Sequence, residues 1–439
     1  MMRRPNNYWL SYVLSLSFLL LFIIVVNQYN SNNTYLFTST ANRKNIKIII
    51  KVEDGAEIYM KEIPMRLDDE PSNLTTVDGK SIRNKHFTTQ NNTQISEVIE
   101  KILEDARTNI KKELSNYNFS YSGVNALEDL VMETGGQPQR TLIISSWRSG
   151  STFFGDLIDS TPSSYYHYEP LLMFGIKQIR TPAEAGKALE IVKNMFKCNF
   201  DGLEEYFEFE SKDLDLFSHS TRLWDYCKYD NKHDLCFDAE FNSRMCKLFP
   251  FQSMKLVRLR LRLVEEIIKD KDLNVKVILL TRDPRGLMQS RRQRHFCELS
   301  SDCWEPSLVC ADMISDYVAA KSILQKYPER LLVIRFEELV LQQNATIERI
   351  LNFLDIDARK AFNEFLQTHT NVEVAGVHST FKVSRNIPFK WKHTLDYNYV
   401  SELQMACKEA MHLWSYKMAY NETHMTSQDF NPVDDYAIS

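Results

Sequence analysis

The stretch Thr141–Thr152, TLIISSWRSGST, decides the fold of this chain. Its first four residues are β-branched or apolar, which is typical of a buried strand. The residues that follow are mostly small and hydroxylated, with one glycine, Gly150, and one cation, Arg148. Apolar residues at helical spacing come next, in the sequence FFGDLIDS. The order of strand, small-residue loop and helix predicts an α/β fold.

This loop has the chemistry of an anion cradle. Amides at the start of a helix lack partners within the helix, and the helix dipole adds positive potential there. The hydroxyls of Ser149, Ser151 and Thr152 are further donors, and Arg148 is a planar cation suited to phosphate or sulfate. The loop is not a Walker A motif, because no lysine precedes its last hydroxyl residue. A serine-rich turn without a ligand is the alternative interpretation.

The composition describes a foldable globular chain of 439 residues, with 44% hydrophobic and 25% charged residues. This length fits either two domains or one large α/β domain with additional segments. The net charge of −5 gives no general reason to expect nucleic-acid binding. Any basic function must therefore be local.

The amino-terminal sequence predicts a membrane anchor. Trp9–Val26 is an uncharged run that would span roughly 27 Å as a helix, enough for a bilayer core. Arg3 and Arg4 precede it, which favours a cytoplasmic amino terminus and a luminal remainder. A cleavable signal peptide is the rival interpretation, but no A-x-A-like site follows. The expected layout is a cytoplasmic tail (1–8), an anchor (9–26), a luminal stem (27–137), a catalytic domain (138–422) and a tail (423–439).

Sequons and cysteines fit a luminal location. Six N-x-[ST] sequons start at Asn32, Asn73, Asn91, Asn118, Asn344 and Asn421. All eight cysteines lie beyond residue 190, and an even number in an oxidising lumen predicts disulfide bonds, whose pairing the sequence leaves open. A zinc site is not favoured, because no C-x2-C pair occurs and the histidines are scattered. The stem is expected to be mostly spacer, with Ile46–Val52 strand-like and Ile95–Leu114 helical.

One carboxylate, Glu169, lies among four aromatic side chains in the segment Ser164–Phe174, SYYHYEPLLMF. Apolar surroundings raise the pKa of a carboxyl group, so Glu169 is a candidate general base near neutral pH. A surface glutamate on an aromatic-rich loop is the alternative. His167 is the second candidate base, because it is the one histidine nearby.

A second basic segment follows the predicted strand Asn274–Thr281, NVKVILLT, whose apolar run is typical of a buried parallel strand. The segment RDPRGLMQSRRQR places Arg282 at the carboxyl end of that strand, where open α/β sheets bind ligands. Pro284 suits the first turn of a helix, and Ser290 falls about two turns later. This position favours a second anion site over a solvated basic helix.

The remaining pattern adds further elements. Ser253–Arg262 alternates apolar and basic residues, and Leu331–Phe336 is a candidate strand. Helices are expected over 337–354 and 399–416. His378–Trp391, HSTFKVSRNIPFKW, is a polar and basic loop that is either a lid or a surface connection.

Three motifs, SSWRSGSTF, VILLTRDPRGLMQSR and HSTFKVSRN…W, occur in this order behind the predicted anchor. Together they resemble the Golgi carbohydrate sulfotransferases, most closely the galactose/N-acetylglucosamine/N-acetylgalactosamine 6-O-sulfotransferase branch, over roughly Gln139–Met418. The resemblance implies a P-loop NTPase-like α/β domain with a central parallel sheet. It also implies transfer of sulfate from 3′-phosphoadenosine 5′-phosphosulfate (PAPS) to a sugar 6-hydroxyl of a glycosaminoglycan or glycoprotein glycan. The expected location is the Golgi membrane, as a single-pass type II protein without metal or nucleic acid.

The resemblance further implies roles for individual residues. The family's 5′-phosphosulfate loop is similar to Trp147, Arg148, Ser149, Gly150, Ser151, Thr152 and Phe153. Its 3′-phosphate motif is similar to Arg282, Asp283, Pro284, Arg285 and Ser290, with Arg282 and Ser290 as the main contacts. Its YEPL segment makes Glu169 the base, the MKLVR segment puts Lys255 near the site, and the SRN loop puts Arg385 over the nucleotide. The expected catalytic residues are Glu169, Arg148 and Lys255. Trp147 and Thr152 stand where the family often has Thr or Ser, which removes no charge.

Two other functions fit parts of this pattern. A nucleotide-dependent kinase is disfavoured by the missing Walker lysine and by the lack of a recognisable acidic metal site. A non-catalytic glycan-binding type II membrane protein on a sulfotransferase scaffold is the alternative from another class. The sequence leaves open the acceptor sugar, the disulfide pairing, which sequons carry glycans, and the oligomeric state, a homodimer included.

Overall fold

The computed structural model describes residues 36–42, 45–51, 57–59, 63–64, 89–228, 233–370, 387–435 and 438. The chain divides into two compact units, Met1–Lys85 and His86–Ser439. In the first unit, β2 pairs antiparallel with three other strands. The strands are β1 (Leu36–Asn42), β2 (Asn45–Lys51), β3 (Glu57–Tyr59) and β4 (Ile63–Pro64). The predicted strand 46–52 corresponds to β2.

The second unit is built on a parallel sheet of five strands in the order β6-β7-β5-β8-β9. The strands are β5 (Gln139–Ile144), β6 (Ser164–Tyr168), β7 (Phe251–Leu256), β8 (Val275–Thr281) and β9 (Leu331–Arg335). The central strand β5 pairs Gln139 with Phe251 of β7 and Arg140 with Val275 of β8. All five carboxyl ends therefore lie along one edge, and the loop after β5 lies near the point where the strand order reverses, where such sheets bind ligands.

The sequence predicted three of these strands directly and was less clear about the other two. The segments read as strands correspond to β5, β8 and β9. The alternative of an aromatic-rich surface loop around Glu169 is wrong for the residues before Glu169. These residues form strand β6, and all of them are buried. Aromatic residues pack well on a pleated surface. The alternating basic run 253–262 enters β7 and then a buried loop, in which Lys255, Arg258 and Arg260 are all inaccessible to solvent.

Helices pack around this sheet in two main groups, α3 with α16 and α4 with α9 and α13. The first ten helices are α2 (Thr89–Glu113), α3 (Ser151–Asp159), α4 (Pro182–Phe196), α5 (Glu204–Glu210), α6 (Leu214–Phe217), α7 (Thr221–Cys227), α8 (Ala239–Cys246), α9 (Leu261–Ile268), α10 (Pro284–Arg291) and α11 (His295–Glu298). The others are α12 (Ser301–Trp304), α13 (Pro306–Lys326), α14 (Phe336–Leu341), α15 (Gln343–Leu354), α16 (Arg359–Thr370), α17 (Trp391–Thr394), α18 (Tyr397–Ala406), α19 (Lys408–Leu413) and α20 (Glu422–Thr426). Short 3-10 helices are η1 (Phe119–Ser122), η2 (Leu127–Leu130), η3 (Met132–Thr134), η4 (Leu172–Phe174) and η5 (Asp234–Phe237).

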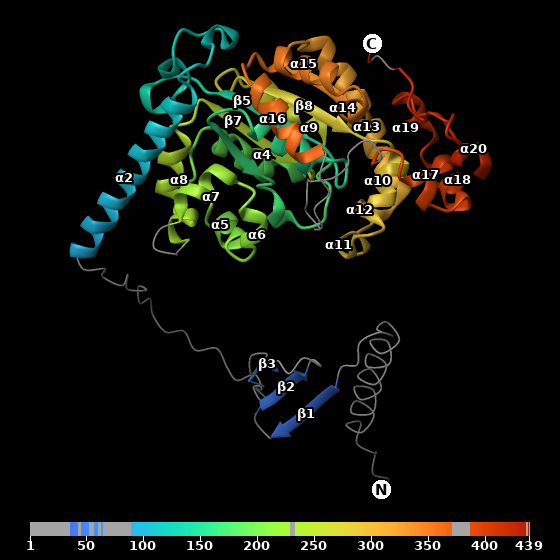
Figure 1. Cartoon of the computed structure of the whole chain (residues 1–439), viewed down its shortest axis with the longest axis horizontal. Coiled ribbons are helices and arrows are strands. Elements are labelled where there is room, and N and C mark those ends of the chain that lie inside the picture. Colours follow the sequence, from blue (N-terminus) through green and yellow to red (C-terminus); the bar gives the residue numbers. More distant parts are fainter. Residues whose placement is uncertain are drawn as a thin grey trace. The chain divides into compact units, whose positions relative to one another are not determined.

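The second unit begins before the stem boundary expected at residue 137. Helix α2 lies beside α8 (Figure 1), and its Leu103 and Ala106 are fully buried in the core of the unit. Arg244 of α8 bonds Glu100 at 2.7 Å. The helical spacing noted over 95–114 thus marks a docked helix rather than spacer, because its apolar face has a partner.

Two predicted helices are each divided in the structure. Gln342 separates α14 from α15, and Cys407 separates α18 from α19. Cys407 forms a disulfide bond with Cys310 of α13, across a sequence separation of 97. The other bonds are Cys198–Cys246, Cys227–Cys236 and Cys297–Cys303, so all eight cysteines are paired. Figure 1 shows α17, α18 and α20 gathered near α10 at one end of the unit.

The predicted anchor, 9–26, lies outside the described residues. Within the described ranges, no helix has both the length and the apolar character needed to cross a bilayer.

Candidate active site

The loop between β5 and α3 is held in place by cations that bind its carbonyl oxygens. Arg260 donates to the carbonyl of Ser145 at 3.0 Å, and Arg291 donates to that of Trp147 at 3.0 Å. Arg282 donates to the carbonyl of Arg148 at 2.9 Å. The backbone amides of residues 147, 148 and 150, by contrast, form no hydrogen bond within the described residues. They join the first amides of α3, which lack helical partners, as free donors for an anion.

The geometry of the loop depends on residues with positive φ. Gly150 caps α3 at φ 88°, and a Cβ there would lie 2.5 Å from the ring of Phe336. Arg148 also has a positive φ, 68°. The loop therefore requires glycine at 150, both for its backbone conformation and for the space that Phe336 occupies.

The three predicted hydroxyl donors have different surroundings. The Ser149 hydroxyl is fully buried and donates to the carbonyl of Ser146 at 2.7 Å, so its predicted role as a ligand donor is wrong for the side chain. Ser151 lies in the first turn of α3. The Thr152 hydroxyl lies 3.4 Å from the ammonium of Lys255.

Two aromatic residues of the predicted phosphosulfate loop are engaged in packing. The Trp147 ring packs with Val257 and the Cys297–Cys303 disulfide, and the guanidinium of Arg258 lies 5.6 Å from the ring centre. The ring of Phe153 contacts that of Phe365 with centroids 5.5 Å apart. Their side chains therefore shape the walls of the site.

Arg148 connects the two predicted anion motifs. Its Nε donates to the Ser290 hydroxyl at 3.1 Å, across 142 positions of sequence. Burial, together with the nearby charges of Arg294 and Arg282, lowers the pKa of Arg148 to about 10. No ion pair with a carboxylate is present at Arg148 or Arg294 within the described chain. An anion is the missing partner for this group of cations.

Arg282 lies at the carboxyl end of β8, as predicted from the sequence. Besides the carbonyl of Arg148 it donates to that of Ile387 at 3.2 Å, and its cation lies 4.8 Å from the centre of the Phe336 ring. The Nε atom of Arg282 is buried and has no hydrogen-bond partner in the described residues. The same holds for the Nε atom of Arg294. Both unpaired donors indicate that the site is built for a ligand with several negative charges.

The first turn of α10 is stabilised by three residues of the predicted 3′-phosphate motif, Asp283, Pro284 and Arg285. Asp283 caps the helix and forms an ion pair with Arg285 at 2.7 Å, and Pro284 occupies its first turn. Arg285 also donates to Gln404 at 2.9 Å and to the carbonyl of Lys417 at 2.8 Å. These contacts occupy the guanidinium of Arg285, so we retain Arg282 and Ser290 as the candidate anion contacts. Arg385 lies outside the described residues.

Glu169 is held between two cations at the ends of β6 and β7. Its Oε1 accepts from Lys255 at 2.7 Å, and its Oε2 accepts from Arg258 at 2.5 Å. Lys255 also lies 3.8 Å from the centre of the Tyr168 ring, and Arg258 donates to the carbonyl of Gly175. Burial alone would raise the pKa of Glu169, but Lys255 and Arg258 outweigh it and hold this pKa below its ordinary value. The expectation of a raised pKa is therefore wrong, and Glu169 is ionised at neutral pH.

His167 is unsuited to replace Glu169 as a base. Its ring is buried against Tyr165, Phe196 and Phe200, on the opposite side of β6 from its neighbours in sequence. Burial lowers its pKa to about 3. The suggestion of His167 as a second candidate base is therefore wrong.

Arg258 and Arg294 are the site residues that sequence reasoning missed. Arg258 stands in the same MKLVR segment as Lys255, and its signal was a second cation within an otherwise buried run. Arg294 stood in a cluster of five arginines, in which nothing local separates a site residue from a solvated one. Within the described residues, no group of His, Cys, Asp or Glu side chains is arranged to hold a metal ion.

The chain is similar in sequence to known sulfotransferases. The model of the sulfotransferase domain matches residues 138–415. Mouse carbohydrate sulfotransferase 4 is 26% identical over 330 residues, which cover 65% of this chain and 83% of that protein. Human carbohydrate sulfotransferase 5 is 24% identical over 336 residues, covering 65% and 80%. Among solved structures, the sulfotransferase domain of the Synechococcus olefin synthase aligns with a TM-score of 0.36 and 16% identity, over 64% of this chain and 96% of that one.

Proposed function

The chain belongs to the sulfotransferase domain family, and from that premise we propose that it transfers the sulfuryl group of PAPS to a sugar 6-hydroxyl. The relatives above are named carbohydrate sulfotransferases, which supports a sugar acceptor. The proposed acceptor unit is galactose, N-acetylgalactosamine or N-acetylglucosamine in a glycosaminoglycan or a glycoprotein glycan.

The observation that carries the proposal is the hydrogen bond between Arg148 and Ser290 at 3.1 Å. It joins the loop after β5 to the helix after β8, so that the two anion motifs form one continuous site. PAPS carries a phosphosulfate at one end and a 3′-phosphate at the other, and therefore needs two such motifs side by side. The unpartnered Nε atoms of Arg282 and Arg294 fit a ligand of this charge.

The residues of the chain then have distinct roles. PAPS supplies an activated sulfuryl group with a phosphate as its leaving group. Arg148 and the loop amides bind and neutralise the phosphosulfate end, and Arg282 with Ser290 binds the 3′-phosphate. Lys255, located between Thr152 and Glu169, places a positive charge beside the group in transfer. Glu169, kept ionised by Lys255 and Arg258, orients the acceptor hydroxyl and accepts its proton.

We further propose that the protein is a Golgi type II membrane protein with a luminal catalytic domain, anchored by 9–26. The asparagines of three sequons, Asn118, Asn344 and Asn421, are exposed on the surface. Four disulfide bonds support an oxidising compartment. Arg385 is proposed to close over the nucleotide.

The test is transfer of radiolabelled sulfate from PAPS by the full chain to a panel of desulfated glycans. We expect label on one class of acceptor, and Arg148→Ala should abolish it and weaken binding of adenosine 3′,5′-bisphosphate about 10- to 100-fold. The control Arg244→Gln removes a surface ion pair on α8 and should change neither value. Nucleotide binding without transfer to any glycan would favour the non-catalytic glycan-binding alternative, and retained affinity in Arg148→Ala would refute the site.

A further inference from the structure

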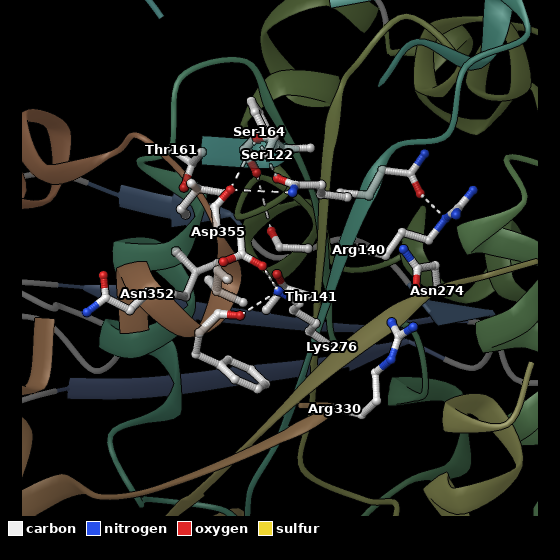
Figure 2. Close-up of a pocket in the computed structure, with 18 of the residues that line it drawn as sticks. Ser122, Arg140, Thr141, Thr161, Ser164, Asn274, Lys276, Arg330, Asn352 and Asp355 are labelled. Atoms are coloured by element: carbon white, nitrogen blue, oxygen red, sulfur yellow. Dashed lines mark hydrogen bonds and ion pairs between the residues drawn. The ribbon is translucent and has the colours of Figure 1, made fainter. Parts of the chain in front are cut away.

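A second large cavity lies at the opposite edge of the parallel sheet. It encloses about 580 Å³, within the range of small-molecule sites. Its walls include Arg140 near the start of β5, Ser164 at the start of β6 and Arg330 immediately before β9 (Figure 2). Because the strands run five to seven residues to the other edge, a ligand here lies roughly 15–20 Å from the proposed sulfuryl site. The cavity is therefore spatially separate from the proposed sulfuryl site.

Hydroxyl and amide side chains form the largest group among the residues that line this cavity. They include Thr141, Thr161, Ser164, Ser253, Asn274 and Asn352. Thr161 is only 3% exposed, yet its hydroxyl has no hydrogen-bond partner in the described residues. Buried hydroxyl groups are normally paired, so a polar ligand or water has to complete this wall. A lining of this kind suits a ligand that carries many hydroxyl groups itself.

The cations Arg140, Lys276 and Arg330 line the cavity together with the carboxylates of Glu329 and Asp355. Lys276 binds the carbonyl of Phe353 at 2.6 Å and pairs with Asp355. Arg140 is also occupied, with bonds of 2.8 Å to the carbonyls of Phe196 and Leu273.

Arg330, by contrast, makes no side-chain hydrogen bond or ion pair with the rest of the described chain. Figure 2 shows its side chain extending toward the wall that carries Asn274 and Lys276. A partly buried guanidinium without a partner favours a ligand with a sulfate or carboxylate group.

An aromatic surface completes the lining. Phe353 lines the cavity and is partly buried, with its ring 5.6 Å from the ammonium of Lys276. Aromatic faces pack against the C–H faces of sugar rings, while amides and charged groups bond their hydroxyls. The combination disfavours an apolar ligand, and it differs from the helix-start cradle that binds nucleotide phosphates.

We infer that this cavity is a second saccharide-binding site, which takes a sulfated sugar unit whose sulfate pairs with Arg330. The site is distinct from the proposed catalytic centre and does not depend on the donor nucleotide. It gives the protein a place to hold sulfated glycan while the other edge of the sheet carries out transfer.

The experiment is photoaffinity mapping. The full chain is irradiated with a sulfated galactose/N-acetylglucosamine tetrasaccharide that carries a diazirine, and labelled peptides are identified by mass spectrometry. We expect label in the segment 350–356 or 274–276. Arg330→Gln should reduce this label at least tenfold, whereas Arg244→Gln, the same change at a surface arginine on α8, should leave it unchanged. Binding of adenosine 3′,5′-bisphosphate by Arg330→Gln should equal that of the unaltered chain.

Several outcomes would overturn the inference. One is that label is found only at the carboxyl edge of the sheet. The others are that the unsulfated tetrasaccharide labels the protein equally well, or that Arg330→Gln is labelled as strongly as the unaltered chain. Arg148→Ala separates the two proposals, because it should lose transfer and keep the label at 350–356. If the proposed catalytic function fails and this label persists, the second site stands independently.

Discussion

At Glu169, charge and burial act in opposite directions. The aromatic neighbours in sequence suggested a raised pKa, but the two cations that decide the matter come from β7 and the loop after it, more than 80 positions away. Such long-range pairs are invisible in a local pattern. The sequence was enough to name Glu169 as a candidate, whereas its protonation depended on the arrangement of the sheet.

Substitution of Glu169 separates turnover from nucleotide binding. Glu169→Gln keeps the shape of the side chain and removes its charge, so we expect transfer to fall at least about 100-fold. The affinity for adenosine 3′,5′-bisphosphate should change only a few-fold, because Arg148 and Arg282 are untouched.

The matched control is Glu338→Gln, since Glu338 is also buried between two cations, Arg335 and Arg349, each at 2.9 Å. Both variants lose an ion pair and some stability, measured by thermal unfolding. Only Glu169→Gln should lose turnover at a temperature where both remain folded. Equal losses of turnover would assign Glu169 a purely structural role.

Glu210 of α5 makes stability depend on pH. It is 2% exposed, and burial, together with the charge of Glu169, raises its pKa to about 8. Between the ordinary carboxyl range and pH 8, the unfolded chain releases this proton and the folded chain keeps it, so stability falls as pH rises.

Glu210→Gln removes that titration. We expect it to be more stable than the unaltered chain at pH 8, by up to about 4 kcal/mol, and similar to it at pH 4.5. Urea unfolding at the two pH values measures the difference. A stability difference that does not change with pH would show that Glu210 is not protonated in the folded state.

At the scale of elements, local order was easier to predict than packing. The strand, loop and helix of 141–158 follow from one short pattern, since β-branched residues, Gly150 and helical spacing act within a few positions. The buried cations after β7 did not follow, because their acidic partners lie elsewhere. Arg260, for example, pairs with Asp316 of α13 at 3.0 Å.

The contact between α3 and the sheet gives a test at this scale. A Cβ on Gly155 would lie 2.1 Å from the hydroxyl oxygen of Tyr166, a buried side chain. Gly155→Ala should therefore destabilise the protein by about 1–3 kcal/mol.

Gly186→Ala in α4 is the matched control, because no atom lies within 4 Å of its Cβ position. It should stabilise the protein by about 0.5–1 kcal/mol through helix propensity. Urea unfolding measures both changes. Destabilisation of the same size at both glycines would refute the steric explanation.

At the scale of the whole molecule, the proposed compartment predicts N-glycans on the surface. Asn118, Asn344 and Asn421 are all exposed, as attachment of a glycan requires. Digestion with an N-glycosidase should lower the apparent mass, on a denaturing gel, of the full chain expressed in secretory cells. Each Asn→Gln substitution at these sites should remove one step of the shift. No shift, together with free thiols, would contradict a luminal location.

The disulfide bond between Cys310 and Cys407 keeps the protein in one covalent piece when a protease cleaves the chain between these two residues. The interval holds β9, α14, α15, α16 and Arg385, and its two ends are covalently joined through α13. A protease that cleaves once inside it produces two fragments that migrate as a single molecule on a gel without reductant. Only a thiol releases the carboxyl-terminal fragment, which carries α19 and Trp414.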